Sequence, residues 1–312
     1  MSFLRRTILL WSLVWLAPSA AADCTIRTGA VYFEDGTLHY REAGAGPTVV
    51  LLHGLFAQKE QWDALLCELA ASGRRALAPD LPGYGESRDF PLAVYPLEFQ
   101  AERLHTLILE LGLDRLDLAG NSMGGTIAAE YAARYPDRVR TLAFIGAPLG
   151  AVDWSEGVRS AIRDGINPFI PLDRDQFALE MRLLFAEPPE IPDSIVEASV
   201  AEYRERQLHY RQVWDIVNLD ADLLRMQSDA RRHHRPPPPP PTLILWGERD
   251  GIFEVSGAQP FQARRPRSRL EILPETGHLP MLERPAETAA AYRRFLDGPE
   301  PTGRDIHRGQ SR

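Results

Sequence analysis

The chain has 312 residues, of which 44% are hydrophobic and 25% are charged, and its formal net charge is −8. This apolar share is typical of a globular protein and excludes an intrinsically disordered chain, while two cysteines are too few for a disulfide-rich scaffold. The negative charge disfavours a phosphate-binding surface, so no nucleic-acid partner is expected.

The first 22 residues have the three-part pattern of a secretory signal peptide. Arg5 and Arg6 precede an apolar stretch at 7–17, and small residues follow up to Ala22. That stretch, about 11 residues or roughly 16 Å as a helix, is too short for a hydrocarbon core of about 30 Å, so no stable transmembrane span is expected. We expect cleavage after Ala22 and an exported protein, either periplasmic or secreted. An uncleaved interfacial anchor and a lipidated Cys24 are the alternatives.

Export would bring both cysteines, Cys24 and Cys67, into an oxidising compartment, where a disulfide is one outcome. Cys67 lies in a stretch whose apolar residues have helical spacing. We therefore expect a buried free thiol there in preference to a disulfide.

Strand-like and helical patterns alternate along most of the chain. Two short strand-like runs begin at about residue 30, and the fully apolar run at 48–52 is typical of a strand buried on both faces. The next expected elements are a helix at 59–72, a strand at 75–79, a helix at 96–111, a strand at 116–119, a helix at 123–135 and a strand at 139–145. After an interruption come strands at 242–246 and 269–273 and a helix at 285–296. This order predicts an α/β fold with a mostly parallel, doubly wound sheet.

The interruption at 147–235 has helical periodicity and no strand-like run, which predicts a helical cap inserted into an α/β domain at 23–297. Its end is a basic cluster at 231–235, expected to be a solvated loop, followed by six prolines at 236–241. The prolines predict a stiff connector into the next strand. The Gly-, Pro- and charge-rich residues 298–312 predict a flexible tail.

The segment from Gly120 to Gly125, with the sequence GNSMGG, stands between an apolar strand and an Ala-rich helix. It matches the G-x-S-x-G nucleophile elbow, a sharp turn that strains the serine backbone and requires small residues two positions to either side. The flanking strand and helix are the context that this motif needs. Ser122 is therefore the candidate nucleophile.

A serine hydroxyl needs a general base, and the base needs an orienting carboxylate. In this fold their order is Ser, then Asp or Glu, then His. The loops after the strands at 242–246 and 269–273 carry Asp250 and His278, which we predict to complete the triad. Glu248 is the alternative acid.

The tetrahedral oxyanion formed during attack requires backbone N–H donors. We expect them from Met123, directly after the nucleophile, and from Leu55, in the loop after the strand at 48–52. His53 is interpreted as a residue that shapes this loop. Asp80, in the glycine-rich segment 79–87, is expected to hold a turn.

No Walker motif, zinc-binding helix or G-x-G-x-x-G after a strand occurs in the sequence. We therefore expect neither a cofactor nor a metal.

These segments resemble the α/β-hydrolase superfamily from about residue 30 to 296, and they occur in the family's order. The motifs at 53–55, 79–87, 120–125, 246–250 and 277–278 carry the resemblance. The segments 184–189 and 277–283 resemble exported bacterial lipases and monoacylglycerol lipases of the ABHD6-like group.

This resemblance implies hydrolysis of a small-molecule or lipid carboxylic ester whose acyl chain enters beneath the cap. Apolar cap residues would line an acyl tunnel, although most of them are expected to form the cap's own core. The candidates are Ile166, Phe169, Ile170, Phe177, Met181, Leu184 and Phe185.

Four other enzyme classes of the superfamily are close relatives. Haloalkane dehalogenases and epoxide hydrolases have an aspartate where this chain has Ser122. The carbon-carbon bond hydrolases of meta-cleavage pathways share the elbow but usually have a tryptophan where Leu279 stands here, and they are the alternative enzyme. Cofactor-free haloperoxidase-like enzymes also share the triad. A low-turnover ligand-binding homologue and a partner-binding role for the prolines and tail are the alternatives outside catalysis.

Overall fold

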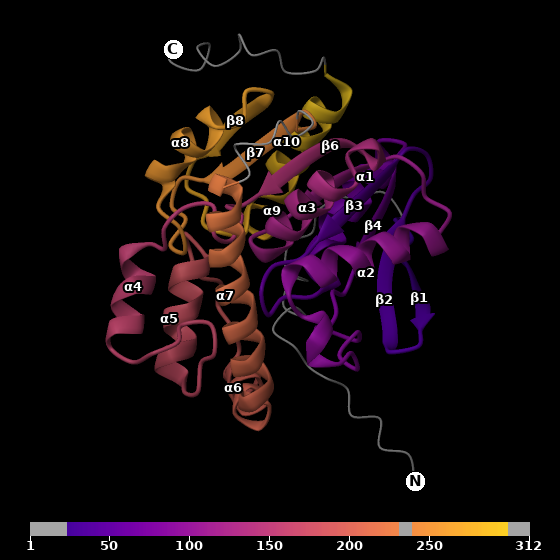
Figure 1. Cartoon of the computed structure of the whole chain (residues 1–312). Coiled ribbons are helices and arrows are strands. Elements are labelled where there is room, and N and C mark those ends of the chain that lie inside the picture. The colour runs from indigo at the N-terminus through magenta and orange to yellow at the C-terminus, as the bar shows by residue number, and fades with distance from the viewer. Residues whose placement is uncertain (1–23, 231–238, 299–312) are drawn as a thin grey trace.

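The structure, a computed structural model, describes residues 24–230 and 239–298 (Figure 1). The sequence expectations for the signal peptide at 1–22, the basic cluster at 231–235, prolines 236–238 and tail residues 299–312 lie outside the described residues.

One eight-stranded sheet forms the centre of the molecule, with the strand order β1-β2-β4-β3-β5-β6-β7-β8. β2 is antiparallel to β1 and β4, and all other neighbouring strands are parallel, so the predicted α/β fold with a mostly parallel sheet is confirmed. The strands are β1 (Arg27–Phe33), β2 (Gly36–Ala43), β3 (Thr48–Leu52), β4 (Arg75–Pro79), β5 (Leu116–Gly120), β6 (Val139–Ile145), β7 (Thr242–Gly247) and β8 (Ser268–Leu273).

Helices cover both faces of the sheet (Figure 1). α1 (Asp63–Ala71) and α10 (Pro285–Asp297) pack on one face, and α2 (Leu97–Glu110) and α3 (Met123–Arg134) pack on the other. In β3, Val49 and Leu51 belong to the core under α1 and α10, while Val50 and Leu52 belong to the opposite core. The run is apolar throughout because alternate side chains meet a different helical layer.

Between β6 and β7 the described residues form four helices, and Figure 1 shows them grouped to one side of the sheet. They are α4 (Glu156–Arg163), α5 (Arg174–Leu184), α6 (Asp193–Glu205) and α7 (Gln207–Ala230), and we call this group the cap. Among the residues that the structure describes, no helix has both the length and the apolar character needed to cross a bilayer.

Short helices account for most differences from the sequence prediction. The helix predicted at 59–72 begins as a 3₁₀ turn, Lys59–Trp62, before α1. Two helices of a few residues each, α8 (Ala258–Ala263) and α9 (Pro280–Glu283), were not predicted, because segments this short show no full period of apolar residues.

The expectation of a free thiol at Cys67 is wrong. Cys24 and Cys67 form a disulfide, with their Cα atoms 5.5 Å apart. Cys67 does lie in α1 as predicted, but helical placement does not prevent pairing. Cys24, three residues before β1, contacts the same core layer as α1, which brings the two sulfurs together.

Candidate active site

The β3 and β5 strands are adjacent, and the strand order reverses between them. In open α/β sheets, ligand sites form at such a reversal, beyond the carboxyl ends of the strands. The loop after β3 begins at His53, and the elbow serine follows β5 at Ser122. Both segments predicted to take part in catalysis therefore leave the sheet at its expected binding edge.

Ser122 has a φ of 50° and a ψ of −118°, a backbone conformation that costs energy for any residue with a Cβ. Three backbone N–H groups, from Gly125, Thr126 and Leu149, donate to the Ser122 carbonyl at 2.9 to 3.2 Å. These hydrogen bonds hold the strained turn in place.

The flanking glycines are required by close backbone contacts. A Cβ on Gly120 would lie 2.3 Å from the carbonyl carbon of Gly124, and a Cβ on Gly124 would lie 2.3 Å from the Leu52 carbonyl oxygen. Helix α3 thus starts directly against the ends of β3 and β5.

The loops after β7 and β8 bring Asp250 and His278 together. His278 Nδ1 lies 2.9 Å from Asp250 Oδ2. Asp250 Oδ1 accepts hydrogen bonds from the Ile252 and Phe253 N–H groups at 2.9 and 3.1 Å. Both carboxylate oxygens are therefore engaged, one on the imidazole and one on the backbone, which fixes the orientation of the ring.

Glu248, the alternative acid, is solvent-exposed, and its Oε2 accepts a hydrogen bond from the Glu275 N–H at 3.2 Å. Asp250, not Glu248, is therefore the carboxylate in contact with His278.

Asn121 links the elbow to the histidine loop, a role that the sequence analysis missed. Its buried Nδ2 donates to the Ile145 carbonyl at 2.8 Å and to the His278 carbonyl at 3.2 Å. A Cβ on Gly146 would lie 2.5 Å from this nitrogen, so Gly146 makes room for it. Its place beside Ser122 in the elbow was the available signal, but its partners are distant in sequence.

Glu283 was also missed, and it joins the histidine loop to the end of α5. Its Oε1 accepts from the Gly277 N–H and its Oε2 from the Ala186 N–H, both at 2.8 Å. The His278 N–H donates to the Leu184 carbonyl at 2.8 Å. These hydrogen bonds hold the backbone of the histidine loop against the end of α5, where the cap meets the sheet.

The two residues predicted to supply oxyanion donors lie at this site. Met123 is the first residue of α3, where N–H groups have no carbonyl partner within the helix. Leu55 lines the same cavity as Ser122, and the next residue, Phe56, has a φ of 57°.

His53 is fully buried behind this loop. Its Nε2 accepts a hydrogen bond from the Leu81 N–H at 2.9 Å, so the proton resides on Nδ1, which donates to the Gly54 carbonyl at 2.8 Å. Burial lowers the pKa of His53 to about 4, which keeps the ring neutral. These contacts fit a residue that shapes the loop.

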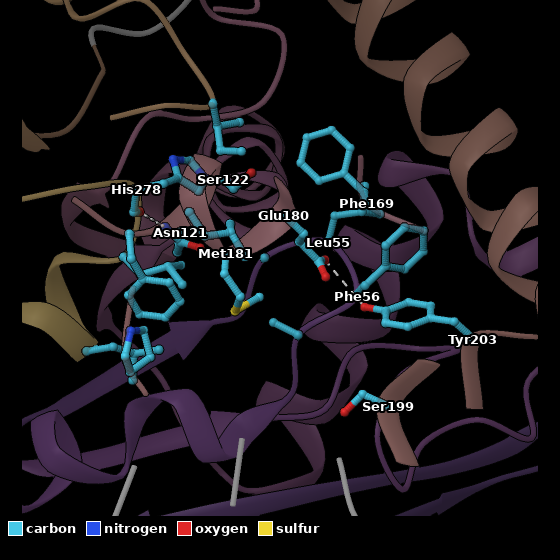
Figure 2. Close-up of a pocket in the computed structure, with 18 of the residues that line it drawn as sticks. Leu55, Phe56, Asn121, Ser122, Phe169, Glu180, Met181, Ser199, Tyr203 and His278 are labelled. Atoms are coloured by element: carbon cyan, nitrogen blue, oxygen red, sulfur yellow. Dashed lines mark hydrogen bonds between the residues drawn. The ribbon is translucent and has the colours of Figure 1, made fainter. Parts of the chain in front are cut away.

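A cavity of about 400 Å³ lies between the cap and the sheet body and is lined by both Ser122 and His278 (Figure 2). This size is typical of small-ligand sites. Of the predicted substrate-binding residues, Phe169, Met181, Leu184 and Phe185 line it, whereas Phe177 packs with Val196 and Val200 inside the cap.

Stacked aromatic rings connect the cap to the site. The Trp154 ring lies 4.8 Å from that of Phe253 and 6.1 Å from that of Trp214 in α7, measured between centroids. The Phe253 ring lies 5.5 Å from the His278 imidazole. We call Trp154, Trp214 and Phe253 the aromatic stack.

In the described residues, no group of three or more His, Cys, Asp or Glu side chains is arranged to hold a metal ion.

A strained serine between strand and helix that lines the same capped cavity as a histidine paired with an aspartate is the arrangement of an α/β-hydrolase site. Residues 47–285 match the family model described as the alpha/beta hydrolase fold, so the chain belongs to this family and the predicted superfamily is confirmed.

Two curated relatives are similar over most of their length. The chain is 29% identical to Lipase 1 of Psychrobacter immobilis, covering 85% of this chain and 80% of that protein. It is 26% identical to the monoacylglycerol lipase abhd6-B of Xenopus laevis, covering 83% and 78% respectively. Among solved structures, a bacterial membrane phospholipase A described as a virulence factor is 32% identical, with a TM-score of 0.71 over 88% of this chain and 86% of that one.

Proposed function

We propose that the protein hydrolyses carboxylic esters, as a lipase or esterase acting on monoacylglycerols or on esters of short to medium acyl chains. The observation that carries the proposal is the pairing of His278 with Asp250 in the cavity that Ser122 lines. The names of the lipase relatives support an ester hydrolase.

The reaction would proceed by two acyl transfers. His278 accepts the Ser122 proton as the hydroxyl attacks the ester carbonyl, and the oxyanion lies against the N–H groups of Leu55 and Met123. The tetrahedral intermediate collapses to an acyl-serine as His278 protonates the departing alcohol. Water activated by His278 then releases the acid, while Asp250 holds the imidazole in the required tautomer.

The acyl chain would lie along the apolar cap wall formed by Phe169, Met181, Leu184 and Phe185, which all line the cavity. Phe177 is not part of this proposal, because it packs in the cap interior.

We test the proposal by measuring initial rates on p-nitrophenyl esters from acetyl to palmitoyl for the wild type and Ser122→Ala. We expect a rate that peaks at one chain length and is lost in the variant. Asp250→Asn should lower kcat by roughly 10³–10⁴-fold, by analogy with other serine triads. Glu248→Gln is the matched control and should retain activity. A wild type without Ser122-dependent turnover on any ester would contradict the proposal and favour carbon-carbon hydrolysis or ligand binding.

We further propose that the protein is exported and that its signal peptide is cleaved after Ala22. The N-terminal sequence pattern and the disulfide between Cys24 and Cys67 support this, because such bonds persist in oxidising compartments. Mass spectrometry of the protein from fractionated cells should find a mature chain that starts at Asp23 outside the cytoplasm. An intact N-terminus in the cytoplasmic fraction would contradict it.

A further inference from the structure

One wall of the cavity is polar, although most of its lining is apolar. Glu180 of α5 and Ser199 and Tyr203 of α6 all line the cavity and are buried, with exposed fractions of 6%, 3% and 7%. Ser199 and Tyr203 are one helical turn apart and so share a face of α6. In the view of Figure 2, Tyr203 and Ser199 lie across the cavity from His278.

These three side chains leave hydrogen-bonding capacity unused. The Tyr203 hydroxyl donates to Glu180 Oε1 at 3.5 Å, as the dashed line in Figure 2 marks. Glu180 Oε2 and Ser199 Oγ are buried, and neither has a hydrogen-bond partner among the described residues. Buried polar atoms are normally satisfied, so a pair without partners in a cavity wall indicates that a ligand supplies them.

The wall is neutral around Glu180. Burial raises the pKa of Glu180 to about 8, so its carboxyl group carries a proton at pH 7. Burial also raises the pKa of Tyr203, which therefore stays a hydroxyl donor. Glu202, which also lines the cavity, pairs with Arg206 at 3.4 Å, so this arginine is already matched by a carboxylate.

We propose that Glu180, Ser199 and Tyr203 form a subsite for a hydroxyl group of the ester substrate. A hydroxyl both donates and accepts, so it is a suitable partner for either unpartnered atom, Glu180 Oε2 or Ser199 Oγ. An anionic group is disfavoured, since no arginine or lysine pairs with Glu180 in the described part of the chain. This inference rests on the proposed ester hydrolysis and narrows its substrate class.

The hydroxyl has two chemical sources, the alcohol half of the ester, as in a monoacylglycerol, or a hydroxylated acyl chain. We would measure kcat/KM on three esters with one acyl length: the methyl ester, the 1-monoacylglycerol and the methyl ester of the hydroxy-acid. The preference for each hydroxylated ester over the plain methyl ester is the readout. The source of the hydroxyl is identified by the ester for which this preference falls when Glu180 is replaced.

Glu180→Met removes the hydrogen-bonding group at similar volume and should lower the preference for the hydroxylated ester over the methyl ester about tenfold. Glu180→Gln should retain this preference within about threefold. Ser199→Ala should lower it by a few-fold. The matched control is Glu197→Met on the exposed side of α6, which should leave the preference unchanged. An unchanged preference for both hydroxylated esters in Glu180→Met would overturn the proposal.

A binding measurement separates failure of the subsite from failure of the proposed function. We would titrate Ser122→Ala, with and without Glu180→Met, with a non-hydrolysable alkyl glycerol ether, an ether of a hydroxylated chain and the plain alkyl methyl ether. Tighter binding of a hydroxylated ether that is lost with Glu180→Met supports the subsite, even if no ester is turned over. Equal affinity for all three ethers would overturn the subsite and leave ester hydrolysis to be decided by the rate assay.

Discussion

Lys59, the single lysine of the sequence, is almost fully buried in an ion-pair cluster. Its Nζ lies 2.6 Å from Asp80 Oδ2 and 2.7 Å from Glu86 Oε2. Asp80 also accepts hydrogen bonds from the backbone N–H groups of Lys59 and Glu86. Asp80 thus holds the turn after β4, as the sequence indicated, but with a partner that the sequence analysis did not identify.

Removal of this cation would leave the Asp80 carboxylate buried without its charge partner. We expect Lys59→Met to lower the free energy of unfolding by about 3–5 kcal/mol. Denaturant unfolding measures the change. Arg174→Met is the control, because it breaks only solvent-exposed ion pairs with Asp193 and Glu197, and exposed pairs contribute little to stability. Equal losses in the two variants would contradict the expectation.

Glu180 should give stability a particular dependence on pH. Its pKa is about 8 in the folded protein against an ordinary value of 4.5, so the folded state keeps a proton that the unfolded state releases. The resulting stabilisation is complete below the unfolded pKa, falls as pH rises and is lost above about 8.

Between these two pKa values the free energy of unfolding should fall by at most about 1.4 kcal/mol per pH unit relative to Glu180→Gln, which does not titrate. Urea unfolding of both proteins across this range measures the difference. Parallel pH profiles would show that Glu180 titrates normally in the folded chain.

Two phenylalanines of the α5 segment differ in what they contact. Phe185, at the end of α5, lines the cavity, whereas Phe177 packs against α6 inside the cap. The same substitution at both positions therefore separates substrate binding from stability.

Phe185→Ala should enlarge the acyl pocket and shift the optimum on p-nitrophenyl esters to longer chains. Phe177→Ala should lower the free energy of unfolding by about 3–5 kcal/mol and leave the optimum in place. If both variants lost stability and neither changed the optimum, the cap wall would not be the acyl site.

The sequence predicted strands better than it predicted contacts between distant segments. The strands at 75–79 and 139–145 have the predicted bounds, because each is a short, mostly apolar segment bounded by turn residues. Motif order pointed to Asp250 and His278, which are in contact. The roles of Asn121, Glu180 and Glu283 depend on which loops and helices meet in space, and no local pattern carries that information.

At the scale of the whole molecule, the disulfide joins the segment before β1 to α1, across 43 residues of sequence. A cross-link restricts the unfolded chain, and the chain-entropy relation for a loop of this length gives about 4 kcal/mol. Sequence spacing alone did not show this pairing, because Cys24 and Cys67 come together only when the fold places Cys24 beside α1.

We expect the Cys24→Ser, Cys67→Ser double variant to unfold at lower urea concentration than the oxidised wild type, by a free energy of about 2–4 kcal/mol. A reducing agent should destabilise the wild type to the level of the double variant and leave that variant unchanged. Insensitivity of the wild type to complete reduction, verified by thiol titration, would contradict this.

The aromatic stack also gives the molecule an optical property. Trp62 and Trp246 are enclosed in the sheet body, whereas the rings of Trp154 and Trp214 lie nearly parallel where the cap meets the site. Indole rings so close together couple their electronic transitions, so near-ultraviolet circular dichroism and fluorescence depend on their spacing. A ligand that lifts the cap would change this signal, and the protein thereby reports the position of its own cap without an attached dye.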